Sequence, residues 1–252
     1  MAESQQGFYV YGIVPSDVET EPDARGVGDP PGEVTTIKHG DVAALVSTVA
    51  TDSSLGTPED LAAHAALLDG ASAAAPVLPI KFGAVLTSEK DVAEELLAAH
   101  HDEFAAALRE LEGKAEYIVR GRYRSEAVLK EILAENADLD DLREAVRDKP
   151  EDATRNERMA LGEAITNAIS AKRDADNQTV QRALDGLGFM TLVREPTHDE
   201  DAVHVACLAE TEQESELEEV VERLAADWDG RVELRLLGPL AAYDFVVSKA
   251  AE

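Results

Sequence analysis

The stretch PVLPIKFGAVL, residues Pro76 to Leu86, joins two prolines to a short apolar run. Proline fixes φ and has no backbone N–H, so Pro76 and Pro79 are expected to end the preceding helix and to leave the residues from Ile80 onward for a sheet. The residues after Pro79 alternate with the period of two that is typical of a half-buried strand. We therefore expect one face with Ile80, Phe82 and Ala84 and the other, turned away from the core, with Lys81, Gly83 and Val85.

A strand, a long loop and a hairpin are predicted before that stretch. The run FYVYGIV is rich in β-branched and aromatic residues, and we expect Phe8, Val10 and Val14 on one face of its strand. Prolines, glycines and acids crowd into the next segment, which is typical of a loop. Two apolar runs then flank a His-Gly-Asp turn. The expected ranges are 8–14 for the strand, 15–32 for the loop, and 34–38 and 42–49 for the hairpin, with Gly40 at its turn.

Two helices are predicted in the first half from their capping residues. Thr57 has the position of an N-cap, with Pro58 at the first helical position and the Asp60 carboxylate able to reach back. The second helix begins after Ser88, ends at Gly113 and is expected to bridge the two halves of the chain. The residues expected to face inward are Leu61, Ala65 and Leu68 in the first helix and Val92, Leu96, Phe104, Leu108 and Leu111 in the second.

The second half has the order strand, helices, two strands, helix, strand. This is the βαββαβ pattern of a ferredoxin-like fold, stretched here by inserted helices. We therefore predict an α+β protein with two domains, residues 1–113 and 114–252, each an antiparallel sheet with helices. The expected strands are 116–123, 189–194, 203–209 and 232–237, and the expected helices begin near Ser125, Asp140, Asp152 and Ser215.

Charge excludes several classes of partner. The 252 residues include 52 acidic and 23 basic residues, which leaves a net charge of −29. Phosphate backbones and anionic lipids need a positive surface, so neither nucleic acid nor a lipid membrane is an expected partner. We favour a solvated acidic surface that keeps the protein soluble over an acidic docking surface.

The sequence also indicates a cytoplasmic protein. The single cysteine, Cys207, cannot form an internal disulfide, which suits a reducing compartment. The first residues, MAESQQG, have neither the basic nor the apolar region of a signal peptide. A run of about 18 apolar residues, long enough to span a bilayer, is also missing.

Residues that could carry chemistry are few. Adjacent histidines on a helix point about 100° apart, so His100 and His101 do not suggest a metal site, and His64 is better interpreted as a hydrogen-bonded core or boundary residue. Cys207 is interpreted as a small buried apolar residue. Phosphate-binding, dinucleotide-binding and nucleophile-elbow motifs are not found. We therefore expect no catalytic residue, no cofactor and no metal.

Two segments remain as candidates for binding. Arg120, Arg122 and Arg124 form a dense basic cluster on the strand 116–123, which either receives an acidic partner or, the account that we favour, pairs with the chain's own carboxylates. The closing segment GPLAAYDFV is apolar and follows the last strand. It either packs over a domain interface or presents Tyr243 and Phe245 to another protein.

Four segments together resemble the gas vesicle GvpL/GvpF family. PVLPIKFG is similar to the family's signature P-V-L-P-x-[KR]-F-G, and the other three segments correspond to its opening, central and closing strands. They occur in the family's order across nearly the whole chain. The three further segments are FYVYGIV at 8–14, EYIVRGRY at 116–123 and GPLAAYDFV at 238–246.

The resemblance implies an accessory or minor structural protein of gas vesicle assembly, located at the gas vesicle or in the cytoplasm. It implies binding of the small hydrophobic shell protein GvpA, and of other gas vesicle accessory proteins, in a chaperone-like or nucleating role. The alternatives are a small-ligand-binding protein or enzyme on a ferredoxin-like scaffold, with His64 or His100 as general base, and an architectural homo-oligomer. The residues that we expect at a partner-binding surface are Lys81, Phe82, Arg120, Arg122, Tyr123, Tyr243 and Phe245.

Overall fold

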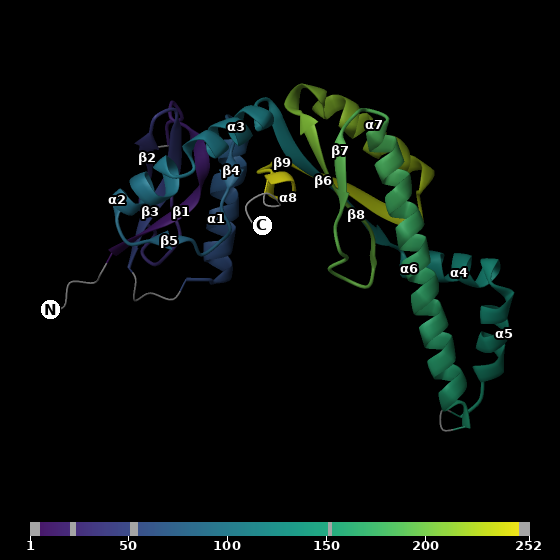
Figure 1. Cartoon of the computed structure of the whole chain (residues 1–252). Coiled ribbons are helices and arrows are strands. Elements are labelled where there is room, and N and C mark those ends of the chain that lie inside the picture. Colours follow the sequence, from purple (N-terminus) through teal and green to yellow (C-terminus); the bar gives the residue numbers. More distant parts are fainter. Residues whose placement is uncertain (1–5, 21–23, 51–54, 151–152, 247–252) are drawn as a thin grey trace. The chain divides into compact units, whose positions relative to one another are not determined.

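The structure is a computed structural model of the chain (Figure 1). The expected helix start at Asp152 and the residues from Met1 to Gln5, part of the segment considered for a signal peptide, lie outside the residues that it describes. The described residues are 6–20, 24–50, 55–150 and 153–246.

The chain divides into two compact units, and segments far apart in sequence join the first of them. Unit 1 consists of residues 1–117, 208–213 and 238–252, and unit 2 of residues 118–207 and 214–237. The boundary expected after residue 113 lies close to the first crossing between the units. The grouping of the two later segments with the N-terminal half was not indicated by the sequence pattern.

Unit 1 is built on a 5-stranded antiparallel sheet with the order β2-β3-β1-β4, in which β5 also pairs with β1. The predicted hairpin is confirmed, and Gly40 at its turn has a positive φ of 61°. Apart from Pro15, which ends β1, and an isolated bridge between Arg25 and Glu33, the described residues of the loop expected at 15–32 form no helix or strand. The strands are β1 (Gln6–Pro15), β2 (Val34–His39), β3 (Val42–Ala50), β4 (Leu78–Pro79) and β5 (Val85–Leu86).

An irregularity in β1 changes which side chains share a face. The register with β3 shifts between Val10 and Gly12, which adds one residue to β1 and reverses its alternation. Val10 and Ile13 therefore pack in one apolar cluster, and Val14 packs in the cluster on the other face. The expectation that Val14 shares a face with Phe8 and Val10 was wrong for this reason.

The Pro76 to Leu86 segment does not form one strand beginning at Ile80. Its strands are β4, which includes Pro79, and β5, and both pair with β1. Between them Gly83 has a φ of 96°, and its N–H donates to the Tyr9 hydroxyl at 3.1 Å in place of a strand carbonyl. The expected strand is therefore interrupted by a turn at Lys81, Phe82 and Gly83, because this glycine takes the conformation that ends a strand.

Helix α1 (Pro58–Ser72) begins with the predicted capping box. Thr57 Oγ1 accepts from the Asp60 N–H at 3.1 Å, and the Asp60 carboxylate accepts from the Thr57 N–H at 3.1 Å. Of the three residues expected to face inward, Leu68 is buried, whereas the expectation was wrong for Leu61, which is 49% exposed, and for Ala65, which is also exposed. Because alanines lie on every side of this helix, its apolar residues do not mark one face as the buried face. The buried residues of α1 are Asp60, His64, Leu68 and Ser72.

The single long helix expected from Ser88 to Gly113 is three consecutive helical segments. Ser88 caps the first, as predicted, by accepting from the Asp91 N–H at 3.1 Å. A π-helix follows, and the chain then leaves helical geometry at His100. All three belong to unit 1. They are α2 (Glu89–Asp91), the π-helix η1 (Val92–Ala98) and α3 (His101–Leu111).

Helices cover both faces of the sheet in unit 1. η1 and α3 contribute Val92, Leu97 and Leu108 to the cluster on the Val10 face. On the Tyr9 face α1 contributes Leu68. Each face of the sheet is therefore a separate apolar core.

Unit 2 contains a 4-stranded sheet with the order β7-β8-β6-β9. The first strand of each half, β6 and β8, lies in the centre, and the second strand of each half, β7 and β9, lies at an edge. With its helices this is the ferredoxin-like pattern, so the predicted α+β fold with two antiparallel sheets is confirmed. The strands are β6 (Lys114–Tyr123), β7 (Met190–Val193), β8 (Asp201–Glu210) and β9 (Val232–Leu240).

The inserted helices lie between β6 and β7. α6 runs along the sheet and continues past it, where α4 and α5 pack against it (Figure 1). The short segment η3 (Thr211–Gln213) and α7 follow β8, and α8 follows β9. The described helices include none with the length and apolar character needed to cross a membrane. The helices are α4 (Ser125–Glu135), α5 (Ala137–Val146), α6 (Arg155–Asp185), α7 (Glu214–Asp227) and α8 (Tyr243–Val246).

Candidate partner-binding site

Lys81 and Phe82, both expected at a partner-binding surface, lie in the turn between β4 and β5. The Lys81 side chain is exposed. Phe82 is half-buried on the Tyr9 face of the sheet, with its ring centroid 5.7 Å from that of Tyr9 and 5.5 Å from that of His64. Lys81 is therefore accessible to a partner, whereas Phe82 contributes to the core of unit 1.

The closing segment packs within unit 1. The Ala241 N–H donates to Asp69 Oδ1 at 3.1 Å, and the Asp244 N–H donates to Glu116 Oε2 at 2.9 Å. Burial raises the pKa of Asp69, and the Ala241 N–H partly offsets this effect. Phe245 packs on the Val10 cluster. Of the two alternatives for this segment, its contacts in the structure are those of packing within the protein.

Tyr243 ends a hydrogen-bonded chain of three rings on the other face. The Tyr9 hydroxyl lies 2.9 Å from His64 Nδ1, and the Tyr243 hydroxyl lies 2.9 Å from His64 Nε2. A neutral imidazole donates through one nitrogen and accepts through the other, so it satisfies both hydroxyls at once. Burial raises the pKa of Tyr9 to about 12 and also raises the pKa of Tyr243. His64 thus connects α1 to β1 and to the closing segment.

Acidification is expected to destabilise unit 1 through His64. Its side chain is 4% exposed, and burial lowers its pKa below the usual 6.5. Between the two values the unfolded chain binds a proton that the folded chain does not, so the free energy of unfolding falls as the pH drops below about 6.5. Chemical denaturation followed by circular dichroism over this range, compared with His64→Gln, measures the effect.

The pKa itself provides a direct check that does not depend on how the variant folds. We expect the ¹³C-labelled imidazole of His64 to titrate below the usual imidazole pKa of 6.5. Titration of His64 at or above that pH, or an equal pH dependence of stability in His64→Gln, would contradict the prediction.

The basic cluster of β6 lies beside a buried carboxylate. Arg120 Nη2 is 3.5 Å from Asp201 Oδ2, and Arg122 Nε is 3.9 Å from Asp201 Oδ1. Asp201 is 1% exposed, and burial opposes its ionisation. Hydrogen bonds from the N–H and hydroxyl of Thr197 and from the His198 N–H, together with the charge of Arg120, lower its pKa to about 2. These two arginines therefore pair with a carboxylate of the chain itself, while Arg124 is exposed.

Tyr123 is buried in the core of unit 2. Its hydroxyl donates to Asp176 Oδ2 at 2.7 Å, and burial together with this contact raises its pKa. Arg231 donates to both oxygens of Asp176, at 3.1 and 2.9 Å, and to Glu131 Oε2 at 2.7 Å. Lys172 contacts Glu131 Oε1 at 2.7 Å. Tyr123 is only 6% exposed. The expectation that it lies at a partner-binding surface was therefore wrong, and it has a structural role in this network.

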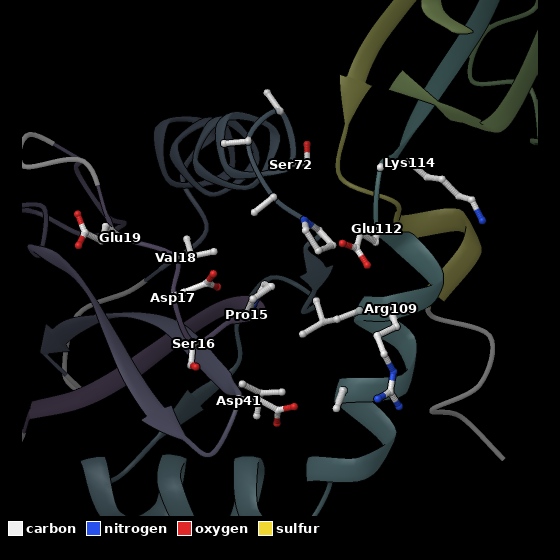
Figure 2. A pocket seen from close by; sticks show the side chains of 18 of the residues that line it. Pro15, Ser16, Asp17, Val18, Glu19, Asp41, Ser72, Arg109, Glu112 and Lys114 are labelled. Atoms are coloured by element: carbon white, nitrogen blue, oxygen red, sulfur yellow. The ribbon is translucent and has the colours of Figure 1, made fainter. Parts of the chain in front are cut away.

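Unit 1 also contains an open cavity of about 860 Å³ (Figure 2). Its walls are the chain after β1, the end of α1, and α3 with the start of β6. Carboxylates exceed cations among its lining side chains, and Figure 2 shows Arg109 and Glu112 on the α3 side. The charged lining residues are Asp17, Glu19, Asp41, Arg109, Glu112 and Lys114.

Within the described parts of the chain, His, Cys, Asp and Glu side chains do not form a group of three or more that could hold a metal ion. Cys207 is buried, with no exposed surface, in β8. The rings of His39 and His101 approach to 5.8 Å, and His101 Nε2 lies 2.5 Å from Asp41 Oδ1. His101 thus lies between the ring of His39 and the Asp41 carboxylate.

Strand β7 presents a further exposed surface that the sequence pattern did not indicate. It is an edge strand, and three of its four side chains are apolar and exposed: Met190 at 58%, Leu192 at 40% and Val193 at 41%. The available signal was the uncharged run Met-Thr-Leu-Val, which lacks the polar alternation of a strand with one solvated face. Only the sheet order shows that this run lies at an edge.

The profile of the family described as gas vesicle synthesis protein GvpL/GvpF matches residues 7–247. The chain belongs to the GvpL/GvpF family. The resemblance of the four sequence segments is thereby confirmed, and the match includes both units of this family member.

Curated relatives of this GvpL/GvpF protein have the name gas vesicle protein F. The protein from a Streptomyces species is 32% identical over 240 residues, which cover 94% of this chain and 98% of that protein. The protein from Dolichospermum flosaquae is 23% identical, with 94% of this chain and 96% of that protein covered. The similarity therefore extends over nearly the full length of each chain.

Two crystal structures have the same fold as this GvpL/GvpF protein. GvpF from an Anabaena species superposes with a TM-score of 0.76 at 23% identity, covering 96% of this chain and 98% of that chain. GvpF from Microcystis aeruginosa gives 0.75 at 21% identity, covering 95% and 98%. The arrangement of elements is thus shared although most side chains differ.

Proposed function

We propose that this protein is an assembly factor of the gas vesicle that binds the small hydrophobic shell protein GvpA and holds it before or during its incorporation, in a chaperone-like or nucleating role. The observation that carries the proposal is the GvpL/GvpF match over residues 7–247. We extend the proposed set of partners to other gas vesicle accessory proteins and the proposed location to the gas vesicle and the cytoplasm.

Physical properties of the chain support this role. A subunit that polymerises into a gas-facing wall must expose apolar surface and strand edges, which aggregate unless they are covered. A net charge of −29 keeps a carrier of such a subunit dispersed through repulsion between carriers. The protein combines this charge with an exposed apolar edge strand, β7.

Binding is proposed in preference to catalysis. His64, considered as a general base, has both ring nitrogens within 2.9 Å of tyrosine hydroxyls and is almost fully buried. His100, the residue before α3, is exposed, and its Nδ1 lies 3.5 Å from Glu103 Oε2. A general base needs a nitrogen that can reach a substrate proton, so the environment of His64 favours a structural role.

Among the residues expected at the partner-binding surface, accessibility supports Lys81 and Arg122. The Arg122 side chain is 53% exposed and Lys81 is exposed in its turn. Arg120 is more covered, at 31%. Charge reversal at Lys81 and Arg122 is a milder perturbation of the fold than any change at Tyr123 or Tyr243.

Co-expression tests the proposal. The shell protein GvpA is produced alone, with this chain, or with an unrelated acidic protein as control, and its soluble fraction is measured. We expect this chain to raise the soluble yield of GvpA several-fold and to co-purify with it, whereas the control does neither. Equal soluble yield in all three cases, together with no co-purification, would remove the proposal.

A further inference from the structure

Of the described sheet edges, β7 is the one without a charged residue or a proline. Native proteins protect exposed edges with charges, prolines or bulges, because an open edge templates pairing with another chain. β2 carries Lys38, the edge formed by β4 and β5 includes Pro79 and leads into Lys81, and β9 carries Glu233 and Arg235. The run Met-Thr-Leu-Val of β7 has no such protection, although 30% of the residues in this chain are charged.

Hydrogen bonds define the orientation of β7. The Thr191 hydroxyl lies 3.2 Å from Asp185 Oδ1 and 3.4 Å from Gln181 Nε2, so the Thr191 side chain faces α6. Side chains alternate along a strand, so Met190 and Leu192 project from the opposite face of the sheet. Both are exposed there and offer apolar contacts to a strand placed alongside.

Backbone groups of β7 are open to pairing in the same way. The Arg194 N–H, one residue past the strand, donates to His204 O in β8 at 2.8 Å. N–H groups alternate between the two edges of a strand, so those of Thr191 and Val193 point away from β8 toward the free edge. A segment paired there would extend over about 13 Å, given a rise of about 3.3 Å per residue.

We infer that β7 is a docking edge that accepts an extended, uncharged, apolar segment of a partner protein by strand addition, with Met190 and Leu192 contacting its side chains. The inference rests on the proposed function for the identity of that partner, the shell subunit. A second copy of this chain is disfavoured, because two chains of charge −29 repel each other. An apolar, uncharged segment meets no such repulsion.

The test uses the full chain and a defined probe, a short fluorescent peptide of alternating valine and threonine, with fluorescence anisotropy as the measurement. The same peptide N-methylated on every residue, which has no N–H on either edge to donate to β7, is the matched control probe. We expect the unmodified peptide to bind at least about tenfold more tightly than the methylated one.

Two variants perturb the edge in different ways. Val193→Pro removes an outward N–H without touching the ladder to β8, and Leu192→Lys places a charge on the apolar edge. Each is expected to weaken peptide binding by about tenfold or more. Met159→Lys, at a 66% exposed position on α6, adds the same charge elsewhere and is expected to bind as the wild type does. If Val193→Pro fails to fold, Leu192→Lys decides alone.

The failure of the docking edge and the failure of the proposed function give different experimental results. An unbound peptide, or equal binding by wild type and Leu192→Lys, overturns the docking edge whatever GvpA does. A wild-type dimer that Leu192→Lys dissociates in sedimentation assigns the edge to a second copy and also overturns the inference. Peptide binding at β7 without co-purification of GvpA removes the proposed function and leaves the docking edge in place.

Discussion

Replacing Arg231 with methionine is expected to lower the free energy of unfolding of unit 2 by about 3–5 kcal/mol. Arg231 donates to both oxygens of Asp176 and to Glu131, and burial alone would lower its pKa, but these two carboxylates raise it. Arg231→Met removes the cation and leaves the buried Asp176 carboxylate with only the Tyr123 hydroxyl as a donor in this network. An uncompensated buried charge is the reason for the size of the effect.

Denaturation followed by tryptophan fluorescence measures this change. The single tryptophan, Trp228, lies in unit 2 with its ring 5.7 Å from the Arg231 guanidinium. Arg235→Met is the matched control, because Arg235 pairs with Glu233 on the surface and is expected to change stability by less than about 1 kcal/mol. A loss below about 1 kcal/mol in Arg231→Met would show that the network does not stabilise the unit.

Replacing Gly12 with valine is expected to destabilise unit 1 by about 3 kcal/mol. A Cβ at Gly12 would lie 2.8 Å from the Leu78 carbonyl oxygen and 2.9 Å from Leu68 Cδ2. The first of these atoms belongs to the backbone of β4, so the pairing between β1 and β4 has to shift to accommodate a side chain. Valine adds two methyl groups to the same space.

The effect of Gly12→Val is measured from the free energy of unfolding and from hydrogen exchange of the β1 amides. We expect faster exchange in β1 than in the wild type. Gly70→Ala is the control, because a Cβ at Gly70 in α1 meets no atom within 4 Å. This substitution is expected to stabilise the helix by about 0.5–1 kcal/mol. Unchanged exchange and stability in Gly12→Val would show that β4 adapts without cost.

Local patterns were enough to predict most elements. The Thr57 capping box, the Gly40 hairpin and the βαββαβ order of the second half each depend on residues close together in sequence, and each is present in the structure. The four family segments likewise lie within short windows. These features could be predicted because their cause is local: a cap, a turn glycine or an alternation.

The predictions of individual strands and helices were wrong where a contact with a residue distant in sequence decided the conformation. The strand expected from Ile80 is interrupted because the Gly83 N–H donates to the Tyr9 hydroxyl, 74 residues away. The expected long helix breaks at His100, next to His101, whose ring contacts Asp41. The inward face of α1 follows His64 and Asp60, whose partners lie in β1, the loop after it and the closing segment.

The residues of the candidate site also fall into those whose exposure could be predicted from local pattern and those whose contacts could not. Periodicity placed Lys81 and Arg122 on outward faces, and the structure agrees. Tyr123 and Tyr243 were also expected at the partner-binding surface, yet their hydroxyls bond to Asp176 and His64. Sequence gave no sign of these partners, because each pair is separated by tens of residues.

By itself the sequence determined the family, the α+β class, the acidic surface and the position of most strands and helices, because each is encoded in composition or in short-range periodicity. Only the tertiary structure decided which residues complete the buried networks around Arg231 and His64, and which strand is left at an unprotected edge. The physical reason is that burial and strand order depend on pairing between segments far apart in the chain. Short-range sequence periodicity carries no information about which distant segments pair.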